Sequence, residues 1–151
     1  MIWPFSNKAG RLSKNARQAI VQAIGAAELG NQGEVRLHIE RSCGVDTPID
    51  RAREIFDATG MQETAAGTGV LLYVAIESRA ACVYAGAGIH SETDEGFWQE
   101  VADEVAEGFS TQTPCDGLVS AIHKIGEILR EHFPSEDEAG NELSNEVSVA
   151  Q

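Results

Sequence analysis

Two adjoining apolar segments, separated by a short polar turn, constrain the fold of this chain more than any other feature. The first covers residues 69–76, and after the turn at residues 77–79 the second covers residues 80–85. The first segment has no polar interruption apart from one tyrosine, which is typical of a strand buried on both faces and therefore of an α/β layered fold rather than a helical bundle. The turn is so short that the two strands must be antiparallel.

The rest of the chain predicts one further strand and four helices. Residues 33–40 alternate between apolar and polar side chains, as in a strand with one polar face. Apolar residues at helical spacing predict helices over residues 13–28, 47–60, 93–109 and 116–133. A helix joins the first two strands, so these should be parallel. The predicted fold class is α/β, with a small mixed β-sheet sandwiched between helices in the order α-β-α-β-β-α-α.

The predicted domain covers residues 13–134, after a leader at residues 1–12. Residues 135–151 carry five acids and no base, and we expect them to form a disordered tail. The net charge of −13 excludes binding to a phosphate backbone, so nucleic acid is not an expected partner. No segment has the roughly 20 apolar residues of a membrane span. The cysteines, which form no C-x-x-C pair, predict reduced thiols in a cytoplasmic protein, and Cys82 is expected to be a small core residue.

The segment that follows the hairpin is the predicted ligand site. Gly86 and Gly88 would let backbone amides approach a ligand, or they would simply permit a tight turn. The pattern G-x-G-x-x-G is incomplete because position 91 is Ser91, so no nucleotide is expected. The third strand runs against the second, which places this segment beside the beginnings of the first two strands.

Four carboxylates could meet around that segment, namely Glu34, Glu92, Asp94 and Glu95. Flexible clusters of oxygen ligands suit Ca²⁺, which accepts about six to eight of them. Alternatively, the last three acids only complement the dipole at the start of the next helix.

Phosphate-ester hydrolysis is the competing chemistry. Arg36 and His38, two residues apart on the polar face of the first strand, could supply positive charge and proton transfer. No C-x5-R loop or D-x-D pair accompanies them, and a structural role for both, with Arg36 neutralised by Glu34 or Glu40, is the alternative. On the third predicted helix, Glu100, Asp103, Glu104 and Glu107 form either a solvated face or a docking surface for a basic protein partner.

The chain also resembles a known family in several short motifs in the same order and spacing. They are Ala26–Glu28, Gly33–Glu40, Ala52–Phe56, Gly60–Met61 with Thr64, Gly69–Ala75, Gly88–His90, Phe97–Trp98 and Gly117–Leu118. Over roughly residues 15 to 134 this pattern resembles the TPM domain, which is shared by thylakoid-lumen photosystem-repair proteins, a nematode receptor modulator and many short bacterial proteins.

The resemblance implies a mixed α/β sandwich and offers two kinds of function. Some plant members are described as acid phosphatases, and related bacterial domains as binding calcium. Where close relatives read Gly-Asp-x-Gly-Ile, this chain has Gly86 in place of the aspartate. The loss of that aspartate argues against calcium binding inherited from the family, so a calcium site at the loop after the third strand would rest on the four carboxylates named above. We expect a non-catalytic accessory or binding module, with a weak metal-assisted acid phosphatase as the alternative.

Overall fold

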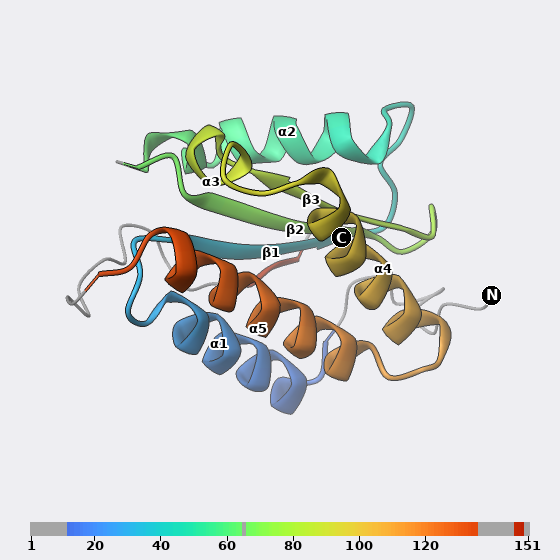
Figure 1. Cartoon of the computed structure of the whole chain (residues 1–151). Helices are drawn as coiled ribbons and strands as arrows, with labels where there is room; N and C mark the ends of the chain where they lie inside the picture. The colour runs from blue at the N-terminus through green and yellow to red at the C-terminus, as the bar shows by residue number, and fades with distance from the viewer. Residues whose placement is uncertain (1–11, 65, 136–146, 150–151) are drawn as a thin grey trace.

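The computed structural model describes residues 12–64, 66–135 and 147–149. One β-sheet lies between two helical layers (Figure 1). The elements in chain order are α1 (Lys14–Glu28), β1 (Glu34–Glu40), α2 (Pro48–Ala58), the short 3-10 helix η1 (Met61–Glu63), β2 (Gly69–Ala75), β3 (Ala80–Ala85), α3 (Ala87–His90), α4 (Glu95–Ser110), α5 (Pro114–His132) and β4 (Val147–Val149). No helix among the described residues is both long and apolar enough to cross a membrane.

The sheet has the strand order β3-β2-β1-β4. Strands β1 and β2 are parallel, in a register that starts with Glu34 opposite Gly69, and β3 is antiparallel to β2. The predicted α/β fold class and the order α-β-α-β-β-α-α are therefore confirmed. Strand β2 is buried at every position, as its uninterrupted apolar sequence predicted.

Two apolar cores flank the sheet. The larger core lies between the sheet and helices α1, α4 and α5, where the inward side chains of β1, namely Val35, Leu37 and Ile39, are packed. The smaller core lies under α2 and contains Phe56 and Tyr73. The period of two along each strand sends neighbouring side chains to opposite cores, which explains why one short strand contributes to both.

Side-chain caps fix the starts of three helices. Ser13, Thr47 and Asp94 each accept a hydrogen bond from a backbone N–H three residues later. These bonds satisfy amides that have no partner within the helix. Two helices begin with a proline at the first or second position, where the missing N–H costs nothing.

Three short elements depart from the sequence prediction. The tail predicted as disordered contains β4, which pairs in parallel with β1 and covers the edge of that strand; the disorder prediction is therefore wrong for residues 147–149, whereas residues 136–146 and 150–151 lie outside the described residues. The predicted loop after α2 includes η1, and the predicted ligand loop includes α3. Most of the leader, residues 1–11, also lies outside the described residues.

Candidate functional site

A cavity of about 430 Å³ lies where β3 ends. Its walls come from the start of α2, the end of β3, the short helix α3 and the start of α4. The described side chains that line it are Ile49, Val83, Tyr84, Ala85, Ala87, His90, Ser91, Glu95 and Trp98. The cavity therefore includes the loop after the third strand that the sequence singled out.

Gly86 and Gly88 permit a close approach between two backbone segments. A Cβ at Gly88 would lie 2.0 Å from the carbonyl oxygen of Ala66, and one at Gly86 would lie 2.6 Å from that of Gly67. The Ile89 N–H also donates to the Gly67 oxygen at 3.1 Å. Close packing against residues 66–67 thus explains both glycines structurally, and a direct role in binding a ligand stays a prediction.

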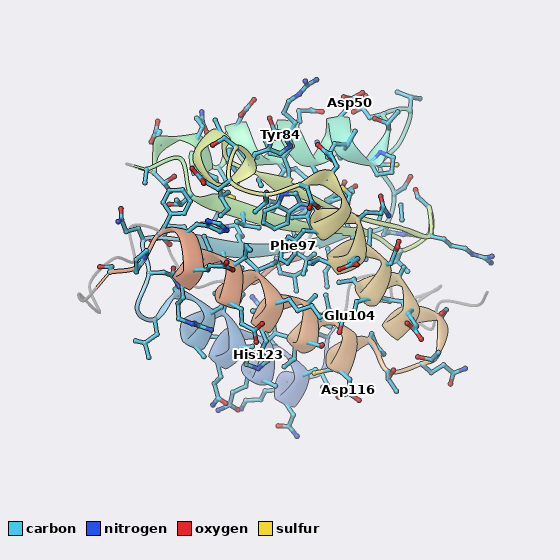
Figure 2. The ribbon with its side chains drawn as sticks, in the orientation of Figure 1. Asp50, Tyr84, Phe97, Glu104, Asp116 and His123 are labelled. Carbon is cyan, nitrogen blue, oxygen red and sulfur yellow. The ribbon has the colours of Figure 1, made fainter. Side chains whose placement is uncertain are left out.

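Local hydrogen bonds order the rim of the cavity. The Trp98 indole N–H donates to Thr93 Oγ1 at 2.7 Å, and the Thr93 hydroxyl donates to the Ile89 carbonyl at 3.1 Å. His90 Nε2 lies 2.9 Å from Glu95 Oε1, and both side chains are more than half exposed. One wall is therefore aromatic, and the mouth carries an exposed carboxylate. Figure 2 shows Tyr84 near α2 and α3, together with Phe97, whose ring meets that of Trp98 edge to face at 4.7 Å.

The four predicted metal ligands do not form one cluster. Glu34 is buried at the start of β1. Asp94 accepts the Phe97 N–H as a helix cap, Glu95 faces His90, and Glu92 lies 3.9 Å from His132. In the part of the chain that the structure describes, no three His, Cys, Asp or Glu side chains are placed to hold a metal ion. The calcium site stays a prediction.

The carboxyl group of Glu34 lies close to that of Glu28. One carboxylate oxygen of Glu28 accepts the Val35 N–H at 2.8 Å, and its other oxygen is buried without a hydrogen-bond partner among the described residues. Burial, together with the nearby Glu34 carboxyl, raises the pKa of Glu28 to about 8, against the lowering effect of the Val35 N–H. Two carboxyl groups in one buried site favour retention of a proton.

Arg36 and His38, the predicted phosphatase residues, lie on the face of β1 that turns toward α2. His38 Nε2 is 3.4 Å from Glu40, and its ring stacks on Tyr73 with 6.2 Å between the centroids. Burial lowers the pKa of His38, although Glu40 acts in the opposite direction. Arg36 Nε is buried without a hydrogen-bond partner among the described residues. A catalytic role for either residue stays a prediction.

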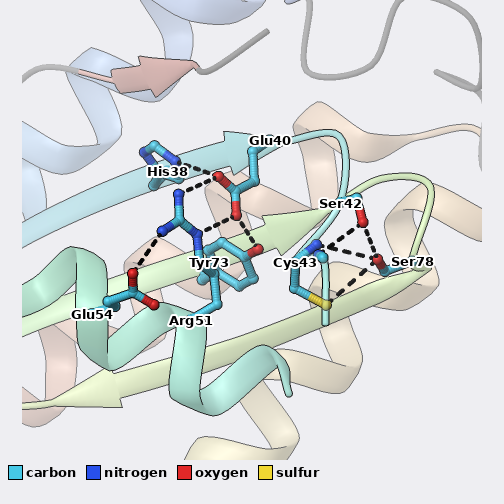
Figure 3. Close-up of polar contacts among 9 residues, drawn as sticks. His38, Glu40, Ser42, Cys43, Arg51, Glu54, Tyr73 and Ser78 are labelled. Atoms are coloured by element: carbon cyan, nitrogen blue, oxygen red, sulfur yellow. Dashed lines mark hydrogen bonds and ion pairs between the residues drawn. The ribbon is translucent and has the colours of Figure 1, made fainter. Parts of the chain in front are cut away.

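A polar network around Glu40 was missed by the sequence analysis (Figure 3). Arg51 of α2 donates two hydrogen bonds to the Glu40 carboxylate, at 2.9 and 3.0 Å, and the Tyr73 hydroxyl donates a third. Burial opposes ionisation of Glu40, but the bonds from Arg51 and Tyr73 outweigh it and hold the pKa of Glu40 below its ordinary value. The only hint in the sequence was Tyr73, a hydroxyl in an otherwise apolar strand that needs a partner.

The acidic face of α4 is less free than predicted. Glu104 forms an ion pair of 2.8 Å with Lys124 of α5 and accepts a hydrogen bond from Ser120. Figure 2 shows Glu104 on the side of α4 that faces α5. Within the face, Asp103 accepts a hydrogen bond from Gln99 at 2.8 Å. One of its four acids therefore already has a basic partner in the neighbouring helix.

Comparisons with known proteins show the family and the fold of this chain. The family model described as the TPM domain matches residues 5–128. The NMR structure of the BA42 protein from the psychrophilic bacterium Bizionia argentinensis is similar, with 34% sequence identity, 92% of this chain and 95% of that chain covered, and a TM-score of 0.83.

Two further solved structures share the fold at low identity. They are the N-terminal domain of a protein from P. gingivalis (16% identity, 85% of this chain and 84% of that chain, TM-score 0.69) and the N-terminal domain of cg2496 from Corynebacterium glutamicum (14%, 94% and 82%, TM-score 0.60). No curated protein matches the chain.

Proposed function

The chain belongs to the TPM domain family. We propose that it is a binding module whose ligand site is the cavity at the end of β3. The observation that carries the proposal is the lining of this cavity, which combines the aromatic residues Tyr84 and Trp98 with the exposed carboxylate of Glu95. The cavity's volume of about 430 Å³ lies within the range of about 300–1,000 Å³ that is common for ligand sites. Fold membership alone would not support a function, because unrelated functions share folds.

The lining of the cavity favours a ligand that is partly apolar and positively charged. Tyr84 offers partly exposed aromatic surface, Trp98 lines the wall although it is only 5% exposed, and Ile49, which is 46% exposed, adds an aliphatic surface. Glu95 places a carboxylate at the mouth. A cation that carries an apolar group could contact these surfaces together.

The same lining argues against phosphoryl transfer. Stabilising a transferring phosphoryl group needs preorganised positive charge or a metal ion. Among the described residues of the cavity only His90 can carry a positive charge, and it faces Glu95 at 2.9 Å. Arg36 and His38, which the phosphatase alternative requires, lie outside this lining.

Titration with benzamidinium, an aromatic cation, tests the binding proposal. We expect its addition to shift the backbone amide resonances of residues 84–98 in ¹H–¹⁵N spectra, and Glu95→Gln to weaken binding. Glu77→Gln is the matched control because it removes an exposed carboxylate at the opposite end of the hairpin. Shifts elsewhere, or equal affinities for the two variants, would overturn the assignment of the site.

A phosphatase assay tests the competing class. We expect purified protein to release no p-nitrophenol from p-nitrophenyl phosphate, with or without divalent metal. Metal-stimulated turnover that is lost in Arg36→Ala and in His38→Ala would instead establish the enzyme. Turnover that survives both substitutions would come from a contaminating phosphatase.

Calcium belongs to the proposal only as an ion attracted by the charges of Glu92, Asp94 and Glu95, because among the described residues these acids do not form a coordination cluster. An ion that binds only the native state raises the melting temperature by mass action. A higher melting temperature in millimolar CaCl₂ would support this part if the increase is smaller for Asp94→Asn than for the wild type, each protein being compared with itself in calcium-free buffer. Identical melting curves with and without calcium would contradict the calcium part of the proposal and would leave the proposal for the cavity unaffected.

A further inference from the structure

Strand β3 ends the sheet on its open side. It pairs with β2, and no described residue pairs with its other edge. The opposite end of the sheet is different, because β4 covers β1 there. An uncovered strand presents unpaired N–H and C=O groups, on which another extended chain can form hydrogen bonds.

The register shows which groups of β3 point outward. The Gly86 N–H donates to the Gly69 oxygen at 2.7 Å, which continues the β2–β3 register one position beyond the pair of Val70 and Ala85. Inward and outward backbone groups alternate along an antiparallel strand. The N–H and C=O groups of Val83 and Ala85 therefore point away from β2, and both residues line the cavity.

The cavity straddles this edge. Ile49 belongs to α2, which packs on one face of the sheet, and Trp98 belongs to α4, which packs on the other. Helix side chains thus flank a groove whose floor is the outer edge of β3. The strand also lacks the usual protection of an edge, since residues 80–85 include no charged residue and no proline.

The acidic residues near the groove indicate what kind of segment it binds. Glu95 lines the mouth of the groove, and two further acids, Glu92 and Asp94, precede it directly in the chain, whereas no lysine or arginine is among the described lining residues. A second copy of this chain, with its own net charge of −13, would be repelled at the same edge. A segment that carries lysine or arginine at alternate positions would place its backbone on Val83 and Ala85 and its charges beside these acids.

We propose that β3 binds an extended basic segment of a partner protein by strand addition, with the side chains of that segment in the cavity between Ile49 and Trp98. This inference rests on the proposed function and adds the class of ligand. The hydrogen bonds would come from main-chain groups, and selectivity would come from the acids and the cavity.

The test uses a blocked peptide that alternates valine and lysine, titrated into the full-length protein. We expect large shifts and slowed hydrogen exchange of the Val83 and Ala85 amides. The same peptide with N-methyl groups on its central residues cannot donate to the strand and should bind at least about tenfold more weakly. Its glutamate counterpart should bind more weakly still, and Glu95→Gln should weaken binding of the basic peptide about fivefold, the value of one exposed ion pair.

Ala85→Pro blocks the edge from the protein side, because a proline is tolerated where the N–H faces outward. The N-methylated peptide keeps the test decisive if that variant does not fold. Equal binding of the methylated and unmethylated peptides would overturn the inference, as would self-association through Val83 and Ala85 without any peptide. If the peptide does not bind while benzamidinium still does, the inference of strand addition is wrong and the proposed function is unaffected.

Discussion

Arg51 and Glu40 form a two-pronged ion pair that ties helix α2 to the end of strand β1. Arg51 Nε lies 2.9 Å from Glu40 Oε2, and Arg51 Nη2 lies 3.0 Å from Glu40 Oε1. The Glu40 side chain is only 8% exposed, so its charge depends on these bonds for compensation. The pair is the main polar connection between the α2 layer and the sheet in the part of the chain shown in Figure 3.

Removal of Arg51 should therefore destabilise the domain markedly. We expect Arg51→Ala to lower the free energy of unfolding by about 2–3 kcal/mol, because it leaves a buried carboxylate with fewer donors. Arg53→Ala is the matched control on the same helix, since Arg53 and its partner Asp50 are both more than half exposed, and it should cost under about 0.5 kcal/mol. Urea denaturation measures both, and equal losses would contradict the role given to Arg51.

Glu28 should make stability fall as the pH rises toward 8. Its pKa is about 8 in the folded protein against 4.5 as the ordinary value, so the folded state binds more protons in this window and loses stability with rising pH. The loss is at most about 1.4 kcal/mol per pH unit, the value for one proton. His38, whose pKa is lowered, has the opposite effect, which is confined to pH values below about 6.5.

Denaturation between pH 6.5 and pH 8 isolates the Glu28 effect. Glu28→Gln should flatten the dependence, because glutamine resembles the protonated carboxyl and can still accept the Val35 N–H. Glu127→Gln changes an exposed carboxylate and should leave the slope unchanged. A wild-type slope that persists in Glu28→Gln would show that another group retains the proton.

Gly88 should not tolerate a side chain. Gly88→Ala would bring Cβ to 2.0 Å from the Ala66 carbonyl oxygen, and the backbone would have to move to relieve the contact. We expect a loss of about 1–3 kcal/mol, together with weaker benzamidinium binding because the cavity loop shifts. The exposed neighbouring substitution Ala87→Ser should stay within about 0.5 kcal/mol. Thermal unfolding that leaves Gly88→Ala at the wild-type midpoint would refute the packing explanation.

Cys82 should react slowly with thiol reagents in the native state. Burial raises the pKa of its thiol to about 12, with a further contribution from Cys43. At pH 8 the thiolate fraction is then about one part in ten thousand. In the double variant Cys43→Ser, Cys115→Ser, we expect slow release of thionitrobenzoate from Ellman's reagent until denaturant is added. Fast reaction of the native variant would mean that packing of the partly buried Cys82 against the smaller core does not suppress its thiolate.

Local patterns in the sequence were sufficient for most of the fold. Alternation over residues 33–40 predicted which side chains of β1 reach the larger core, and Val35, Leu37 and Ile39 are there. The short turn after residue 76 predicted the antiparallel β2–β3 pair, and the intervening helix predicted the parallel β1–β2 pair. These features of the fold depend on periodicity and chain connectivity, and both can be read from residues that are close together in the sequence.

For the site, the sequence located the loop but not its surroundings. It placed residues 86–95 beside the starts of the first two strands, and Ile89 does contact Gly67 there. Nothing in the sequence indicated that Ile49 lines the cavity, because Ile49 is an exposed residue of α2. The polar face predicted for β1 does not mark a solvent-exposed side of the strand, since Glu34 and Glu40 are buried.

The sequence by itself thus determined the types of the main elements, their order and the relative directions of the first three strands. The tertiary structure alone decided that Glu40 meets Arg51 and that Glu28 shares a buried site with Glu34. It also decided that β4 pairs with β1, while none of the described residues pairs with the outer edge of β3. The reason is that a periodic pattern records only which face of an element is apolar. The partner of a buried charge, or of a strand edge, depends on how distant segments pack, and that choice leaves no mark in the local sequence.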